Sequence, residues 1–113
     1  MTKKQYEPAV AALHDAHSIC IVTHLRPDAD AIGSAAALLL ALRQRGKDVC
    51  AVVGQEREIS RNLYTIPAAD DVTTSRELPE GYDLYVTVDC GSLGRTGFFA
   101  DRIEPVSYTH LTL

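Results

Sequence analysis

The sequence lacks the features that define several large classes of proteins. It has no tryptophan, a single methionine and no apolar run approaching the roughly 20 residues of a membrane-spanning helix. Its three cysteines, Cys20, Cys50 and Cys90, are widely spaced without a Cys-x-x-Cys pair. This spacing argues against disulfide or metal–thiolate roles and favours buried free thiols. No charged-then-apolar signal peptide opens the chain, so we expect a cytoplasmic protein with no membrane association.

Positive charge is also scarce. Lysine and arginine total 11 against 15 aspartates and glutamates, which gives a formal net charge of −4. This balance argues against a surface that coats nucleic acid. It does not exclude a metal-filled pocket for one small phosphate ester, because bound cations reverse the local sign of charge. A length of 113 residues, with 46% hydrophobic and 23% charged residues, is typical of one soluble globular domain.

The glycine-rich loops of common nucleotide-binding folds are missing as well. No Gly-x-Gly-x-x-Gly follows the first apolar run, and no P-loop sequence is present. This counts against a non-catalytic Rossmann-like module that binds a nucleotide or a partner, which we keep as the alternative function. A purely structural fragment is a third interpretation.

The apolar segments that are present predict an α/β fold. Three short runs rich in isoleucine and valine predict strands at Ile19–Thr23, Val49–Val53 and Leu84–Val88. Between the first two lies the Ala- and Leu-rich segment 35–42, which predicts a helix that ends near Gly46. We interpret Gly33 and the alanines as letting this helix lie close to the sheet. The strand–helix–strand order predicts a Rossmann-like, three-layer arrangement with a mainly parallel sheet of three to four strands. Further expected elements are a helix over 4–16, a short helix over 60–64 and a brief strand near residue 72.

Three polar side chains lie between the first strand and the first long helix. These are His24, Asp28 and Asp30, and Asp89 follows the third strand. The carboxyl ends of parallel strands meet at one edge of a sheet, where ligands bind. Pro27 delays the helix, and an extended loop would point both Asp28 and Asp30 to one side. Two interpretations remain open for each aspartate: a helix N-cap or a metal ligand.

Two motifs carry a resemblance to a known family. The first is His24-x-x-Pro27-Asp28-x-Asp30-Ala31-x-Gly33-Ser34, and the second is Val88-Asp89-Cys90-Gly91. They resemble the two opening motifs of the DHH-family phosphoesterases. Within that family they are most similar to the branch that degrades very short RNA and dephosphorylates 3′-phosphoadenosine 5′-phosphate. The resemblance covers residues 18–99.

This resemblance implies a metal-dependent phosphoesterase that hydrolyses short single-stranded oligoribonucleotides, 3′-phosphoadenosine 5′-phosphate or similar small nucleotide esters. It implies a two-metal centre of Mn²⁺ or Mg²⁺, with His24 and Asp28 on one ion, Asp30 on the other and Asp89 bridging them. Asp30 and Asp89 are the expected catalytic residues. Arg95 is a candidate for binding substrate phosphate. The resemblance is also compatible with a homodimeric parent protein.

The sequence departs from the family in its second half. The Asp-His-His motif that names the family is absent, as is the glycine-rich substrate-binding domain. We therefore expect residues 1–105 to be an N-terminal part of a DHH domain that is inactive by itself. The segment Val106–Leu113 resembles an in-frame translation of a transposon-end sequencing adapter. We expect this tail to be non-native and poorly packed, and we assign His110 no metal role.

Overall fold

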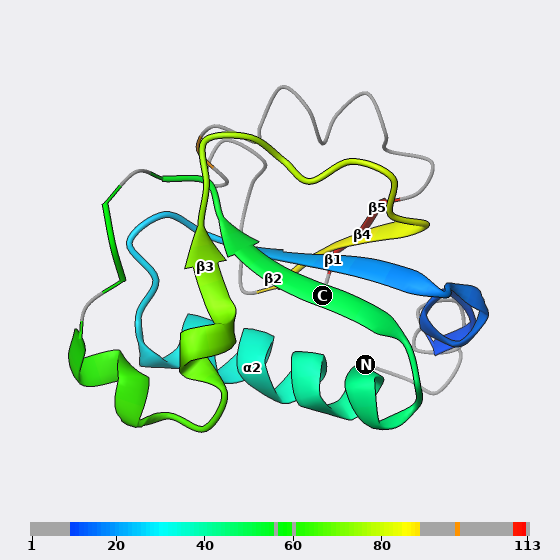
Figure 1. Ribbon diagram of the computed structural model, residues 1–113, viewed down its shortest axis with the longest axis horizontal. Helices are drawn as coiled ribbons and strands as arrows, with labels where there is room; N and C mark the ends of the chain where they lie inside the picture. Colours follow the sequence, from blue (N-terminus) through cyan, green and yellow to red (C-terminus); the bar gives the residue numbers. More distant parts are fainter. Residues whose placement is uncertain (1–9, 56, 60, 89–96, 98–109, 113) are drawn as a thin grey trace.

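The computed structural model describes residues 10–55, 57–59, 61–88, 97 and 110–112 of the chain. The described strands form a single parallel sheet in the order β3-β2-β1-β4-β5 (Figure 1). Their bounds are β1 Ser18–Thr23, β2 Asp48–Val53, β3 Val72–Thr74, β4 Leu84–Thr87 and β5 His110–Thr112. The α/β class, the parallel pairing and the three main strands are confirmed. The brief strand expected near residue 72 is β3.

The helices lie in the connections between these strands. Residues 10–15 are helical, in agreement with the second half of the helix predicted over 4–16, whose earlier residues lie outside the described part. The long helix α2 spans Ala29–Gln44 and lies along one face of the sheet (Figure 1). Two short 3₁₀ helices, η1 Arg61–Thr65 and η2 Ala69–Asp71, precede β3. In the described residues no helix is both long and apolar enough to cross a membrane.

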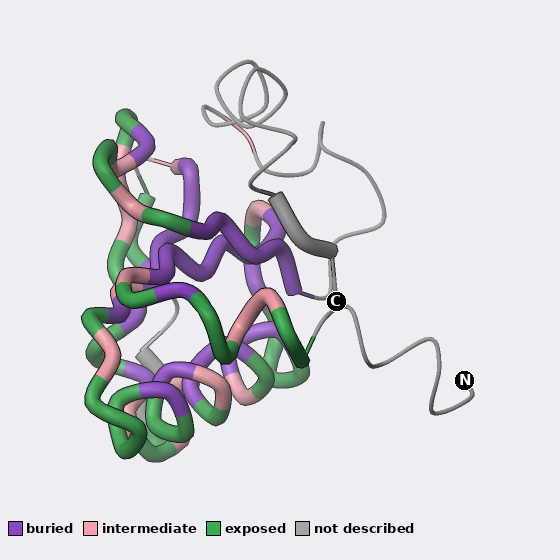
Figure 2. The backbone as a smooth tube through the Cα atoms, turned by 90° about the vertical axis from the view of Figure 1, so that its right-hand side faces the viewer, coloured by how far each residue is buried: buried purple, intermediate pink, exposed green. Residues whose placement is uncertain are grey.

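The central strands bury both of their faces, with alternate residues entering different cores. Ile19 and Ile21 of β1 join the main core under α2, together with Leu39 from that helix. Cys20 and Val22, the alternate residues of β1, join a smaller core on the other face. This alternation is the consequence of strand geometry, in which successive side chains point to opposite faces. Figure 2 shows the strands as a buried layer, while α2 alternates buried and exposed residues.

Helix α2 begins six residues earlier than the predicted helix. Asp28 is its N-cap, and the Asp28 Oδ1 atom accepts a hydrogen bond of 2.9 Å from the Ala31 amide. The helix therefore already includes Asp30 and Gly33. A Cβ built at Gly33 meets nothing within 4 Å, so our interpretation that this glycine is needed for close packing is wrong.

The end of α2 follows the predicted pattern. Gly46 has φ +80°, and its amide donates to the Arg43 carbonyl at 3.0 Å. The Lys47 amide donates to the Leu42 carbonyl at 3.3 Å, which completes a Schellman motif. Glycine is favoured at this position because the left-handed conformation brings a Cβ too close to the backbone.

The fifth strand comes from the tail that we expected to be poorly packed. Its residues His110–Thr112 pair in parallel with Tyr85, Val86 and Thr87 of β4. A short segment containing leucine and threonine suits the edge of a parallel sheet, because its backbone satisfies the free edge of β4. The expectation of an unpaired tail is wrong for these three residues. The adapter origin of residues 106–113 stays a prediction.

Candidate functional site

The carboxyl ends of β1 and β4 are joined by two hydrogen bonds. The Val88 amide donates to the Val22 carbonyl at 2.9 Å, and the buried Thr23 hydroxyl donates to the Val88 carbonyl at 3.0 Å. These contacts fix the two chain positions from which His24 and Asp89 continue. Asp89 and Arg95 themselves lie outside the described residues, so their roles stay predictions.

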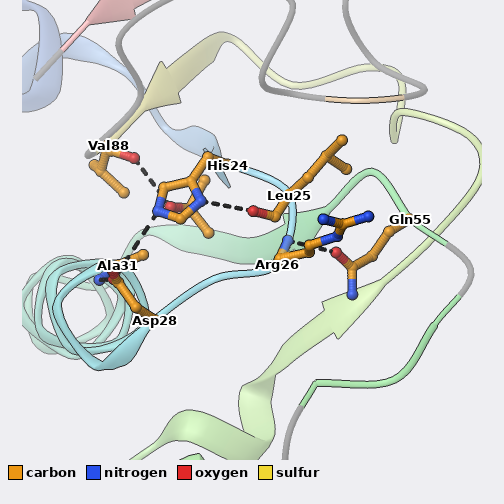
Figure 3. A network of polar contacts seen from close by, with 8 residues as sticks. His24, Leu25, Arg26, Asp28, Ala31, Gln55 and Val88 are labelled. Atoms are coloured by element: carbon orange, nitrogen blue, oxygen red, sulfur yellow. Dashed lines mark hydrogen bonds and ion pairs between the residues drawn. The ribbon is translucent and has the colours of Figure 1, made fainter.

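His24 is a buried imidazole at this edge of the sheet, with 8% of its surface exposed. Its Nδ1 atom lies 2.7 Å from the Leu25 carbonyl oxygen (Figure 3). Because a carbonyl oxygen only accepts, Nδ1 is assigned as the donor in this contact. The Nε2 atom faces Asp28, at 3.9 Å from Oδ1. Imidazole ligands of metals are oriented in this way, with the other ring nitrogen donating to a carbonyl.

The sequence left two interpretations open for Asp28, and the structure tests the helix N-cap. Its N-cap role is confirmed by the hydrogen bond from the Ala31 amide. The side chain nevertheless remains 66% exposed. A carboxylate has about four lone-pair positions, so one N-cap bond leaves room for a cation beside His24.

Asp30 lies in the first turn of α2, where an acidic side chain interacts favourably with the helix dipole. Our expectation of an extended loop that points Asp28 and Asp30 to one side is therefore wrong. Residues in a helix turn by about 100° per position, so the alternation of an extended chain does not apply. In the described part of the chain, no three His, Cys, Asp or Glu side chains gather closely enough to hold a metal ion. The structure brings His24 and Asp28 together and leaves Asp30 outside that pair.

The side chain of Gln55 contacts the loop that contains His24 and Asp28. Arg26 has a left-handed backbone, with φ +51°, and its amide donates to the Gln55 Oε1 atom at 2.8 Å (Figure 3). Gln55 Nε2 in turn donates to the Arg57 carbonyl at 2.6 Å. No sequence pattern indicates this contact, because Gln55 follows β2 and belongs to neither motif.

Next to this contact is a hollow of about 270 Å³. It is lined by Arg26, Pro27, Gln55, Arg57, Glu58 and Ile59. Among the described residues of its lining, Arg26 and Arg57 carry positive charge and Glu58 carries negative charge. The hollow adjoins the loop that holds His24 and Asp28, so an anionic group of a ligand could lie there.

The donor set of the candidate site fits a hard divalent cation in part. An imidazole nitrogen and a carboxylate oxygen are present together, and the carboxylate is the kind of ligand that Mn²⁺ and Mg²⁺ prefer. Two ligands alone hold such an ion weakly. The described part of the site therefore accounts for the pair His24 and Asp28, and further ligands must come from elsewhere.

Comparison with known proteins supports the fold described above. In a crystal structure, an exopolyphosphatase-related protein from Bacteroides fragilis has the same fold, with a TM-score of 0.76 and 23% sequence identity. The match covers 99% of this chain and 36% of that protein, so the present chain spans about a third of its length. The model of the DHH family N-terminal domain matches residues 18–110, which include both motifs. The chain therefore belongs to the DHH family, as an N-terminal domain of that family.

Proposed function

We propose that this chain is part of a divalent-metal-dependent phosphoesterase. Its metal ligands in this proposal are His24, Asp28, Asp30 and Asp89. Membership of the DHH family supports the reaction class. The observation that carries the proposal is the position of His24 Nε2, which faces the Asp28 carboxylate while Nδ1 is fixed by a carbonyl.

The residues around this pair hold it in place. The Thr23 hydroxyl and the Val88 amide join β1 to β4 directly before His24 and Asp89. Gln55 fixes the Arg26 amide in the middle of the loop. Such supports matter because phosphoryl transfer depends mainly on positioning and on electrostatic stabilisation. Bound divalent cations would supply an activated water at neutral pH and neutralise charge on the phosphoryl oxygens.

For the substrate, we propose short oligoribonucleotides or 3′-phosphoadenosine 5′-phosphate. The support is the likeness of both motifs to the branch of the family that acts on these esters. The arginine-lined hollow beside the loop adds a place where a phosphate of such a substrate could be neutralised. Arg95 is a further candidate for that contact. An acidic chain with two arginines lining a hollow suits a small ester better than a long nucleic acid.

The metal site can be tested on the chain itself with Mn²⁺, whose unpaired electrons broaden NMR signals of nearby nuclei. We expect selective broadening of the His24 and Asp28 amide signals at low Mn²⁺ concentration. Asp28→Asn should abolish it, because asparagine keeps the N-cap but removes the charge. Asp70→Asn, which changes an exposed carboxylate in η2, is the matched control. Equal broadening in both variants would show non-specific binding and contradict the site.

The reaction can be tested on the protein encoded at the native locus. We expect Mn²⁺-dependent release of mononucleotide from a diribonucleotide, or of phosphate from 3′-phosphoadenosine 5′-phosphate. Asp89→Ala should abolish this release, because Asp89 would be one of the residues that hold the metal ions, and these would supply the activated water. Binding of nucleotide without hydrolysis in the presence of Mn²⁺ would favour the alternative function, a non-catalytic Rossmann-like module.

A further inference from the structure

Two of the three cysteines face each other across the central pair of strands. Cys20 of β1 and Cys50 of β2 are direct partners in the parallel register. Neighbouring strands lie about 4.7–4.9 Å apart. Disulfides join residues whose Cα atoms are about 4.4–6.8 Å apart, so this register brings the two residues within bonding range. Both are free thiols in the structure.

The two side chains also share one face of the sheet. Cys20 belongs to the smaller core, on the face opposite α2, and Cys50 packs against the edge of the same core. Cys20 is fully buried, whereas Cys50 is half-buried. Tyr82 packs against this core beside them. A small reagent can therefore reach Cys50 before Cys20.

The surroundings of the pair give the two sulfur atoms different acidities. A hydrogen bond from the Cys20 thiol lowers the pKa of Cys50 to about 7, and the Tyr82 hydroxyl acts in the same direction. Burial and the nearby Asp48 raise the pKa of Cys50, while Arg43 lowers it. The hydrogen bond with Cys50, together with burial, raises the pKa of Cys20. Cys50 is thus the nucleophilic thiol and Cys20 the protonated one.

We propose that Cys20 and Cys50 form an oxidation site, at which a peroxide converts the thiol pair into an intramolecular disulfide. In the first step, the Cys50 thiolate attacks one peroxide oxygen and becomes a sulfenic acid. The other oxygen leaves and takes up a proton, as water when the oxidant is hydrogen peroxide. In the second step, Cys20 attacks the Cys50 sulfur, and the hydroxyl group leaves with the Cys20 proton as water. Two thiols and one hydrogen peroxide thereby give one disulfide and two waters.

This site lies in the strand that precedes the candidate metal centre. Cys20 is part of β1, and His24 follows the last residue of that strand. A disulfide is reduced when a thiolate attacks one of its sulfur atoms in thiol–disulfide exchange. The proposed modification is therefore a reversible one. It depends on the register and surroundings of the two thiols, and it stands whether or not the protein is a phosphoesterase.

Mass spectrometry after trypsin digestion tests the proposal on the full chain. The folded protein is treated with hydrogen peroxide, and free thiols are then blocked with N-ethylmaleimide. Because trypsin does not cleave between Arg26 and Pro27, Cys20 lies in peptide 5–43 and Cys50 in peptide 48–57. We expect these two peptides to be linked by a disulfide, with a mass two hydrogens below the sum of the two peptides. Neither Cys20 nor Cys50 should then carry N-ethylmaleimide. Dithiothreitol should separate them.

Two variants separate this pair from the remaining cysteine. Cys90→Ser should leave the linked peptides unchanged. Cys20→Ser should stop the reaction at a Cys50 sulfenic acid, which dimedone traps. Failure of the Cys90→Ser protein to form the 5–43 to 48–57 link, with Cys50 still free to react with N-ethylmaleimide, would overturn the proposal. So would a link that formed equally well in urea, because it would not depend on the strand register.

Discussion

The hydroxyl of Thr23 donates a hydrogen bond of 3.0 Å to the carbonyl oxygen of Val88, 65 residues further along the chain. Thr23 is the last residue of β1, and Val88 directly follows β4. The bond is buried, so neither group can be satisfied by solvent when the other is removed. It joins the ends of β1 and β4, after which His24 and Asp89 follow in the sequence.

We expect Thr23→Val to lower the free energy of unfolding by about 1–3 kcal/mol, because the buried Val88 carbonyl loses its hydroxyl partner. Thr23→Ser keeps the hydroxyl and loses one methyl group, which costs about 0.8 kcal/mol. Urea denaturation of both variants measures the difference. A valine variant as stable as the serine variant would show that the hydrogen bond contributes little.

Two substitutions at Asp28 should separate its structural role from its proposed metal role. Asp28→Ala removes both the N-cap and the charge, and should cost about 1 kcal/mol of stability. Asp28→Asn keeps the cap and should leave the urea midpoint almost unchanged. Both variants should lose the Mn²⁺-induced broadening at His24. Retained broadening in Asp28→Asn would assign this residue to the helix alone.

Two glycines should respond to alanine with opposite signs. Gly46→Ala forces a side chain into a left-handed conformation, with φ +80°, and should destabilise the protein by about 1–2 kcal/mol. Gly33 lies inside α2, and a new Cβ there would meet open space. Gly33→Ala should therefore stabilise the protein by about 0.5–1 kcal/mol. Thermal unfolding of the two variants tests both signs. A destabilised Gly33→Ala variant would contradict the open space found around a Cβ at this position.

The reactivity of Cys50 should depend on pH in a defined range. Its thiol has a pKa lowered from 9.0 to about 7, so the thiolate fraction is small at pH 6 and dominant at pH 8. We expect its alkylation rate by iodoacetamide to rise through this range, with a midpoint near pH 7. Tyr82→Phe removes a donor to the thiolate, so it should move the midpoint upward. A midpoint above 8 in the unaltered protein would contradict the described environment.

The chain itself determined the main elements of the sheet. Short apolar runs bounded by polar residues indicate strands buried on both faces, and the segments around Ile21, Ala51 and Val86 form the three central strands. The end of α2 was also predictable, because Gly46 adopts the left-handed conformation that stops a helix there. Local chemistry decides these features, so no distant contact is needed to recognise them.

The start of α2 was harder to predict, because several residues could begin a helix. Both Asp28 and Asp30 are good N-cap residues in the sequence. The structure selects Asp28, whose carboxylate accepts the Ala31 amide, and Asp30 becomes part of the helix. The motif thus identified Asp28 and Asp30 as candidate ligands. The choice of N-cap decided that Asp28 precedes the helix and that Asp30 lies within its first turn.

Only the tertiary structure decided which distant groups meet. Gln55 supports the loop at Arg26 across 29 residues of sequence. Cys20 faces Cys50 because of the parallel register between β1 and β2, although their spacing in the chain indicated separate thiols. The three residues of β5 pair with β4 because that edge is open to them. Such contacts depend on strand order and register, which are set by packing of the whole sheet and by no single segment of the sequence.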